Sequence, residues 1–297
     1  PIKAVDLDKA TNIELLETFE KVIVACRRMW EIHMYMMYGV YTAFVLFENM
    51  TRTLLGFDDT SPEFHKLTSG FDNKSFQIDK DLLELAKKAK AMGLEEVFLA
   101  NPASEMRKHL EAAPRGAEFL KDFDEFMVDE AGWRLERMAE INVPTWAEDP
   151  TPAFNMIKMS LQKGIDYNLD EERRKREQER AETERQIMEK VAPEQRSWFK
   201  MILTVAQKSA AFSEEHNHYC ELYCHSLIRR TLLGMGRRWV QAGAIDTPED
   251  MFYLFPDEVR KGGINPDMFN FRPIVERRRA EHKEWIARGN PPAFMTP

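Results

Sequence analysis

Residues 213–230, SEEHNHYCELYCHSLIRR, contain three histidines, two cysteines and three glutamates, which are side chains suited to proton transfer or metal binding. On a helix with about 100° per residue, four of them fall within about 60° of one another and form a polar stripe: Glu214, His218, Glu221 and His225. The opposite, more apolar side carries Phe212, His216, Tyr219, Cys220, Tyr223 and Leu227.

Three kinds of structure are compatible with this segment. His216, Cys220 and Cys224 are four residues apart and could converge on zinc, but structural zinc sites usually draw paired ligands from two segments. The sequence has no second CxxC or HxxxH motif, so we predict no metal site. The polar stripe could be a solvated helix face, or it could face a cleft where a carboxylate orients an imidazole base. Periodicity leaves these last two open.

Long helices must position these residues. Strand-like alternation is almost absent, and the spacing of apolar residues predicts an all-α (mainly α) multi-helix domain with little or no sheet. We expect helices over residues 11–56, 79–92, 115–140, 152–165 and about 193–243, with a turn, an extended piece and a short capped helix over 247–260. Residues 170–185 hold seven acidic and six basic side chains, which predict a long, solvated, self-paired helical arm.

Three prolines, Pro144, Pro150 and Pro152, forbid a regular helix around residues 142–154. We therefore predict a single helical domain over 1–297, with sub-parts 1–141 and 153–297 joined by the connector 142–152.

Composition excludes several functions. The net charge of −8 disfavours nucleic acid as a partner, and the sequence contains no glycine-rich phosphate loop. The most apolar segment, 32–47, is too short to span a membrane, so we expect a helix buried in a protein core and no membrane partner. Three cysteines form no disulfide framework and are typical of the cytoplasm.

Three segments resemble, in order, the central helical domain of the phosphoenolpyruvate synthase-like phosphotransferases, a family that includes rifampicin phosphotransferase and phenylphosphate synthase. They are LTSGFDNKSFQIDKDLLELAKKA (67–89), AGWRLERMAEINVPTWAEDPTPAFNMIK (131–158) and LLGMGRRWVQAGAIDTPEDMFYLFPDEV (232–259). In that family an ATP-grasp domain phosphorylates a histidine on a swivelling domain, which delivers the phosphoryl group to the acceptor held by the helical domain.

The resemblance implies a division of labour between this chain and its partners. The 297 residues show neither the ATP-grasp signature nor the phosphohistidine domain, so we expect no cofactor on this chain, with ATP and Mg on a partner domain. The expected partners are ATP-grasp and phosphohistidine domains or subunits, without which the chain is expected to be inactive.

Departures from the family pattern favour a particular acceptor. A basic pair of the rifampicin phosphotransferases aligns with Glu214 and His218, and tryptophan replaces histidine in Gly132-Trp133-Arg134. Both differences resemble phenylphosphate synthase more closely, so the expected acceptor is a phenol or a similar small aromatic compound with a hydroxyl group.

We assign expected roles on this basis. His218 is the first candidate base, with Glu214 or Glu221 orienting it and His216 as the alternate. The expected phosphoryl-binding residues are Arg134, Arg229 and Arg230, and the expected substrate-binding residues are Trp30, His33, Met34, Met37, Tyr41, Trp133 and His225. Most of the latter recur on one side of helix 29–47, where plain core packing would give the same pattern. A non-catalytic helical small-molecule-binding or scaffold module is the alternative function.

Overall fold

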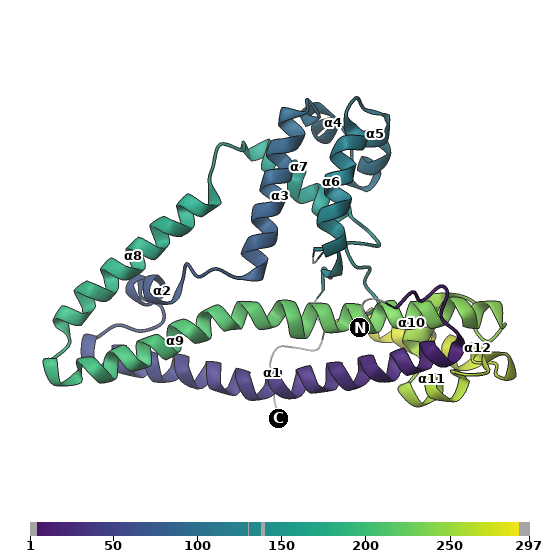
Figure 1. The fold of residues 1–297 in the computed structure, drawn as a ribbon. Helices are drawn as coiled ribbons and strands as arrows, with labels where there is room; N and C mark the ends of the chain where they lie inside the picture. The colour runs from purple at the N-terminus through teal and green to yellow at the C-terminus, as the bar shows by residue number, and fades with distance from the viewer. Residues whose placement is uncertain (1–4, 130, 138–139, 291–297) are drawn as a thin grey trace. The chain divides into compact units, whose positions relative to one another are not determined.

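The computed structural model describes residues 5–129, 131–137 and 140–290, and these are almost entirely helical (Figure 1). Across these ranges no strand forms; one isolated antiparallel bridge joins Leu135 and Thr145. The prediction of an all-α domain is therefore confirmed.

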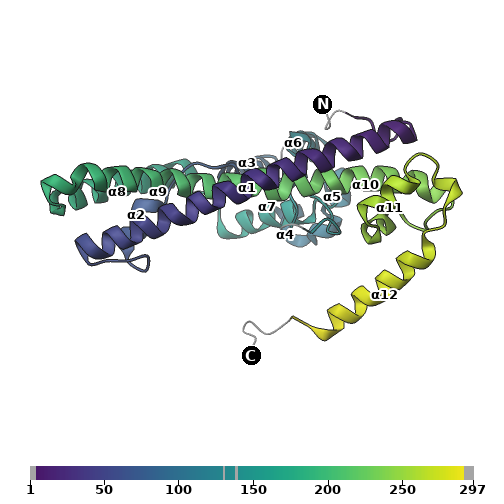
Figure 2. The same cartoon turned by 90° about the horizontal axis from the view of Figure 1, so that it is seen from below.

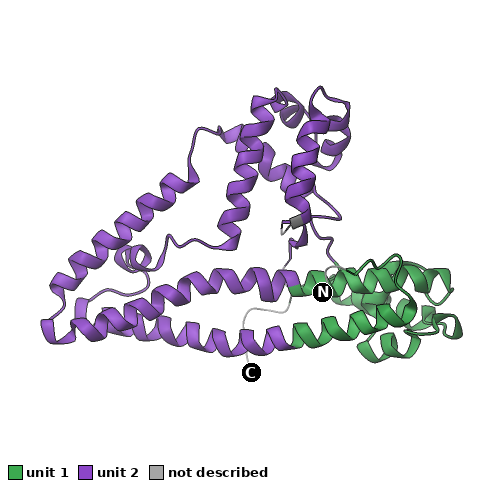
Figure 3. Cartoon of the chain, viewed as in Figure 1, with its two compact units in different colours: residues 1–27, 140–142, 224–297 green, residues 28–139, 143–223 purple. Residues whose placement is uncertain are grey.

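The chain divides into two compact units, each built from separate stretches of sequence (Figure 3). Unit 1 comprises residues 1–27, 140–142 and 224–297, and unit 2 comprises residues 28–139 and 143–223. This grouping differs from a division at the proline-rich connector, because the first long helix and residues 196–241 each contribute to both units. The prediction of a single domain stays a prediction.

The first long helix of the chain, α1 (Asn12–Leu55), agrees with the prediction of a helix over residues 11–56. Its first turn is capped because the Thr11 amide and hydroxyl donate to the Glu14 carboxylate, whereas the Glu14 amide donates back to the Thr11 hydroxyl. The helix ends before Gly56, whose φ of 76° is a conformation that glycine adopts without strain.

In unit 2, the second half of α1 runs beside α9 (Arg196–His216), which follows the short turn η3 (Pro193–Gln195) (Figures 1 and 2). A buried cluster joins them to α2 (Pro62–Thr68) and α8 (Leu169–Lys190), and it contains Phe47, Phe64, Leu67, Ile187, Phe199 and Leu203. This packing fixes the end of α1 against the first half of α9.

Helix α8 is the predicted charged arm, and much of its surface pairs with itself. Arg185 contacts Glu182 and Glu189 one turn away on either side, and Lys175 pairs with Glu171. The predicted arm is not solvated on all sides, however, because Thr183 is buried, and Ile187 just beyond the arm lies in the cluster above.

The rest of unit 2 surrounds a phenylalanine-rich core that includes Phe98, Phe119, Phe123 and Phe154. The rings of Phe123 and Phe154 stack with their centroids 4.2 Å apart. The contributing elements are α3 (Lys74–Ala91), α4 (Glu95–Ala100), η1 (Ala103–Glu105), α5 (Met106–Ala112), α6 (Gly116–Asp129) and α7 (Thr151–Lys163).

The prediction that a helix continues from residue 115 to residue 140 is wrong beyond Asp129. A short turn, η2 (Ala131–Trp133), replaces it, and the Trp146 amide then donates to the Arg134 carbonyl. A Cβ atom at Gly132 would lie 2.1 Å from the Met127 carbonyl oxygen. Only glycine permits this close approach of two backbone segments.

Unit 1 contains α10 (Cys224–Gln241), η5 (Pro248–Tyr253), α11 (Pro256–Gly262), η6 (Pro266–Met268) and α12 (Arg272–Arg288). Its core includes Trp239 and Phe271, whose rings stack at 5.0 Å. The predicted turn and capped helix over 247–260 correspond to η5 and α11.

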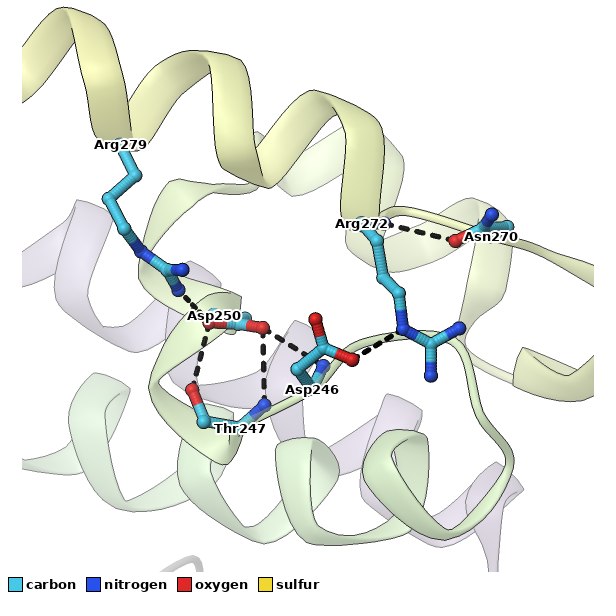
Figure 4. Close-up of polar contacts among 6 residues, drawn as sticks. All are labelled: Asp246, Thr247, Asp250, Asn270, Arg272 and Arg279. Carbon is cyan, nitrogen blue, oxygen red and sulfur yellow. Dashed lines mark hydrogen bonds and ion pairs between the residues drawn. The ribbon is translucent and has the colours of Figure 1, made fainter.

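A buried carboxylate, Asp250, joins η5 to α12 (Figure 4). It accepts hydrogen bonds from the amides of Asp246 and Thr247 and from the Thr247 hydroxyl, and it pairs with Arg279. Burial raises the pKa of Asp250, but these hydrogen bonds and the Arg279 charge more than offset it, so the pKa is below its usual value.

The prediction that residues 32–47 form a helix buried in a core is wrong for one side of that helix. Tyr35, Tyr38 and Tyr41 are 80%, 70% and 65% exposed. Over the described residues, no helix combines the length and apolar character needed to cross a membrane. Residues 291–297 lie outside the described residues.

Candidate functional site

The helix that carries the histidine-rich segment changes its winding there. Helix α9 continues without a break into a π-helix, η4 (Asn217–Tyr223), and then into α10. In a π-helix the hydrogen bonds join residues five apart, so the face that each side chain occupies differs from that in an α-helix. His216 and Glu221, five residues apart, consequently point the same way.

His216 and Glu221 face His33 of α1 within unit 2. The Glu221 Oε1 atom lies 3.8 Å from His216 Nε2 and 3.9 Å from His33 Nδ1. The two imidazole rings lie 5.0 Å apart between centroids. All three side chains are nearly buried, with exposed fractions of 12% or less. We call these three residues the His–His–Glu group.

The group borders a cavity of about 560 Å³ in unit 2. One wall comes from α1 and the other from the end of α9 and the start of η4. The lining residues are His33, Met34, Met37, Tyr38, Tyr41, Ser213, Glu214, His216, Asn217 and Glu221. The structure thus brings together seven residues that the sequence analysis proposed as site residues: His33, Met34, Met37, Tyr41, Glu214, His216 and Glu221.

The predicted polar stripe, by contrast, does not form as one face. Glu214 and Glu221 line the cavity but His218 does not, and Glu221 lies beside His216, which ideal α-helical geometry assigned to the opposite side. The physical reason is the π-helix, which shifts the register of every residue that follows it. His216 is also stacked on Phe212, with ring centroids 5.8 Å apart.

His218, the first candidate base, is buried but does not line the cavity. Burial, and then the positive charges of Lys74 and Arg134, lower the pKa of His218 to about 4. The imidazole is therefore neutral at pH 7 and a weak base.

The remaining predicted aromatic and histidine residues lie outside the cavity lining. Trp30 supports His33, with ring centroids 4.6 Å apart. Trp133 packs against Tyr223 at 5.1 Å. His225 lies on α10, half-buried, in unit 1.

The three predicted phosphoryl-binding arginines are divided between the two units. Arg134 of unit 2 stacks over the Trp146 ring at 4.8 Å. In unit 1, Arg229 donates to the Ile141 carbonyl and Arg230 to the Val5 carbonyl. Both unit 1 arginines therefore hold backbone segments in place.

The residues of the zinc alternative belong to different units, with His216 and Cys220 in unit 2 and Cys224 in unit 1. The Cys26 thiol donates to the Cys224 carbonyl at 3.4 Å, and both thiols are buried in unit 1. Sequence reasoning missed the pairing of His33 with His216, as well as Ser213 and Asn217 in the lining. No local sequence pattern could reveal the pairing of His33 with His216, because the two histidines are on different helices.

With this geometry established, comparison with known proteins defines the class. The sequence profile of a phosphotransferase domain family matches residues 31–214, which is more than half of the chain. The chain belongs to the family described as the rifampicin phosphotransferase fourth domain. The match covers the α1 wall of the cavity but ends just before His216.

Two curated relatives are similar over most of this chain. The uncharacterized phosphotransferase YvkC of Bacillus subtilis (strain 168) is 25% identical over 284 residues, which cover 95% of this chain and 34% of that protein. The chondramide synthase cmdD of Chondromyces crocatus is 25% identical over 257 residues, covering 84% of this chain and 6% of that protein. The chain therefore spans about a third of the first relative and a small part of the second.

Proposed function

We propose that this chain is the acceptor-binding domain of a phosphotransferase and that its cavity holds a small aromatic compound with a hydroxyl group. One observation carries the proposal: three nearly buried ionisable side chains lie beside an exposed wall of methionine and tyrosine side chains. The membership of a phosphotransferase domain family supports it.

The cavity suits such a ligand in size and lining. A volume of about 560 Å³ lies within the range of small-molecule sites. Met34, Tyr38 and Tyr41 are each at least half exposed in the free domain. A flat apolar ligand would cover them, and both methionine and tyrosine side chains adapt well to aromatic rings.

The His–His–Glu group would act on the hydroxyl group. The hydroxyl group of a phenol has a pKa of about 10, so a base must accept its proton at neutral pH. The bond between the hydroxyl oxygen and phosphorus would form as the bond between phosphorus and the donor nitrogen breaks. The hydroxyl proton would pass to His33 or His216, and Glu221 would stabilise the resulting imidazolium.

The donor in this proposal is a phosphohistidine on a swivelling domain, charged by an ATP-grasp domain that uses ATP and Mg. That assignment follows from the resemblance to the family. His218 remains a second candidate base, although its lowered pKa and its position outside the cavity favour the other two histidines. A pure scaffold is less well supported, because Glu221 and His218 are buried.

Acceptor binding to the isolated chain tests the proposal directly. The chain is titrated with phenol and with cyclohexanol, and binding is measured by calorimetry and ligand-observed NMR. Binding should be saturable and stronger for phenol. Tyr41→Ala should weaken phenol binding several-fold. Tyr35→Ala is the matched control, because Tyr35 is exposed on the same helix but does not line the cavity. Equal effects of both substitutions, or no saturable binding of any aromatic alcohol, would overturn the proposal.

A further inference from the structure

The donor atoms of the His–His–Glu group are arranged as ligands of a metal ion. His33, His216 and Glu221 each offer one nitrogen or oxygen atom, and these three atoms all lie within 4.8 Å of one another. They come from two helices of the same unit, α1 and the run of α9 and η4, so packing of that unit brings them together.

The spacing leaves room for an ion between the three donors. Glu221 Oε1 is 3.8 and 3.9 Å from the two imidazole nitrogens, which is too long for direct hydrogen bonds. Among the described residues, His33 Nδ1 has no hydrogen-bond partner. A buried polar nitrogen of this kind is costly unless something else binds it.

We propose that His33, His216 and Glu221 bind one divalent transition-metal ion of the zinc class. Two imidazole nitrogens and one carboxylate oxygen form a ligand set used by catalytic zinc sites, which keep a further position open. Typical metal–ligand distances of about 2.0–2.2 Å place tetrahedral donors roughly 3.3 Å apart. The donors would therefore move toward one another by at most about 1.5 Å on binding, which side-chain rotation can supply.

The donor set also selects against other abundant ions. Imidazole nitrogen suits zinc and related transition metals, whereas magnesium and calcium prefer oxygen ligands. Millimolar magnesium should therefore not compete at this site.

An ion here would have its open position toward the cavity. An acceptor hydroxyl bound to it would lose its proton more readily, because the ion stabilises the alkoxide or phenolate oxygen. With the ion bound, the proton would pass to water, since the ligand nitrogens are occupied by the ion; transfer to His33 or His216 would apply to the ion-free site. This role rests on the proposed function, whereas ion binding itself does not.

The test uses the full chain after removal of any affinity tag and treatment with a chelator. Calorimetric titration with zinc should show one ion per chain, and cobalt(II) should develop visible ligand-field absorption. Glu221→Gln and His33→Gln, on different helices, should each weaken zinc binding by more than about tenfold. His218→Gln is the matched control, because this buried histidine is outside the group, and it should leave zinc affinity unchanged.

Two results would overturn the inference: no saturable zinc binding by the wild-type chain, or equal affinity in the wild-type, Glu221→Gln and His33→Gln proteins. Circular dichroism would verify that each variant is folded. The zinc titration contains no acceptor, donor or ATP, so its outcome does not depend on the outcome of the phenol titration. Phenol binding without zinc binding would reject the metal site alone, and the reverse would reject the proposed acceptor.

Discussion

Glu221 has neighbours that its sequence position does not suggest. In an α-helix it would share a face with His218, three residues earlier, but the π-helix over Asn217–Tyr223 places it beside His216, five residues earlier. π-helical turns are rare and occur frequently at functional sites. The change of winding is what combines a carboxylate with the imidazoles of two helices.

The base assignment gives the first prediction. In a transfer assay with phenol and a phosphorylated donor domain, His216→Gln and Glu221→Gln should each lower the rate by about 10²-fold or more, because a positioned proton acceptor contributes that much and Glu221 stabilises its charged form. His218→Gln should change the rate by less than about fivefold, since a poor base outside the cavity contributes little. The reverse order of effects would return the base role to His218.

Two kinds of buried side chain attach helices to their neighbours in this protein: polar groups with several hydrogen bonds, and apolar groups packed in a cluster. Asp250 shows the first kind, because one carboxylate caps η5 and pairs with α12 (Figure 4). Ile187 shows the second kind, because it attaches an otherwise charged helix to the cluster around Phe199. The two ion pairs of Arg185 on α8 are exposed, and exposed pairs contribute little to stability.

Asp250→Ala should destabilise the protein by about 1–3 kcal/mol at neutral pH, because it leaves buried donors without their acceptor. The pKa of Asp250 is lowered in the fold, so its contribution is complete above the unfolded value of about 3.9 and is lost as pH falls through the lower folded value. Urea unfolding at pH 7 and near pH 3 should show the difference from wild type shrinking in acid. Asp257→Ala, at an almost fully exposed side chain, is the control and should cost under about 0.5 kcal/mol.

Ile187→Ala should lower the free energy of unfolding by about 2–4 kcal/mol, because it opens a cavity in a buried cluster. Arg185→Ala, two residues earlier on the same helix, removes two exposed ion pairs and should cost under about 1 kcal/mol. Urea denaturation of both variants measures the difference. Similar losses would mean that the ion pairs, and not the buried side chain, attach α8.

At the scale of the whole molecule, the chain corresponds to about a third of the phosphotransferase relative YvkC. In the proposed division of labour, this chain would bind the acceptor and other domains would supply the phosphoryl group. Its function would therefore depend on parts of a larger protein or complex.

The chain by itself is accordingly expected to bind phenol without phosphorylating it when ATP and Mg are supplied. Adding ATP-grasp and phosphohistidine domains of a phosphoenolpyruvate synthase-like phosphotransferase should produce ATP-dependent loss of the free hydroxyl group, which chromatography would measure. The donor domains without this chain are the control. Phosphorylation by the chain alone would contradict the proposed division of labour.

Much of the fold could be predicted from the amino-acid sequence, because helices are specified by local patterns. The 3.6-residue spacing of apolar side chains predicted α1 to within a residue at each end. The alternating charges of residues 170–185 identified α8. The same local patterns failed beyond Asp129, where the close contact at Gly132 ends the helix.

The composition of the cavity was also partly predictable, since seven of its lining residues were proposed from their types and spacing. Which of them meet was decided only by the tertiary structure. His33 and His216 are far apart in the chain, and Glu221 joins them through a π-helix that ideal helix geometry excludes. Local sequence determines helices because their hydrogen bonds are local, whereas packing between helices decides where the winding changes and which side chains face one another.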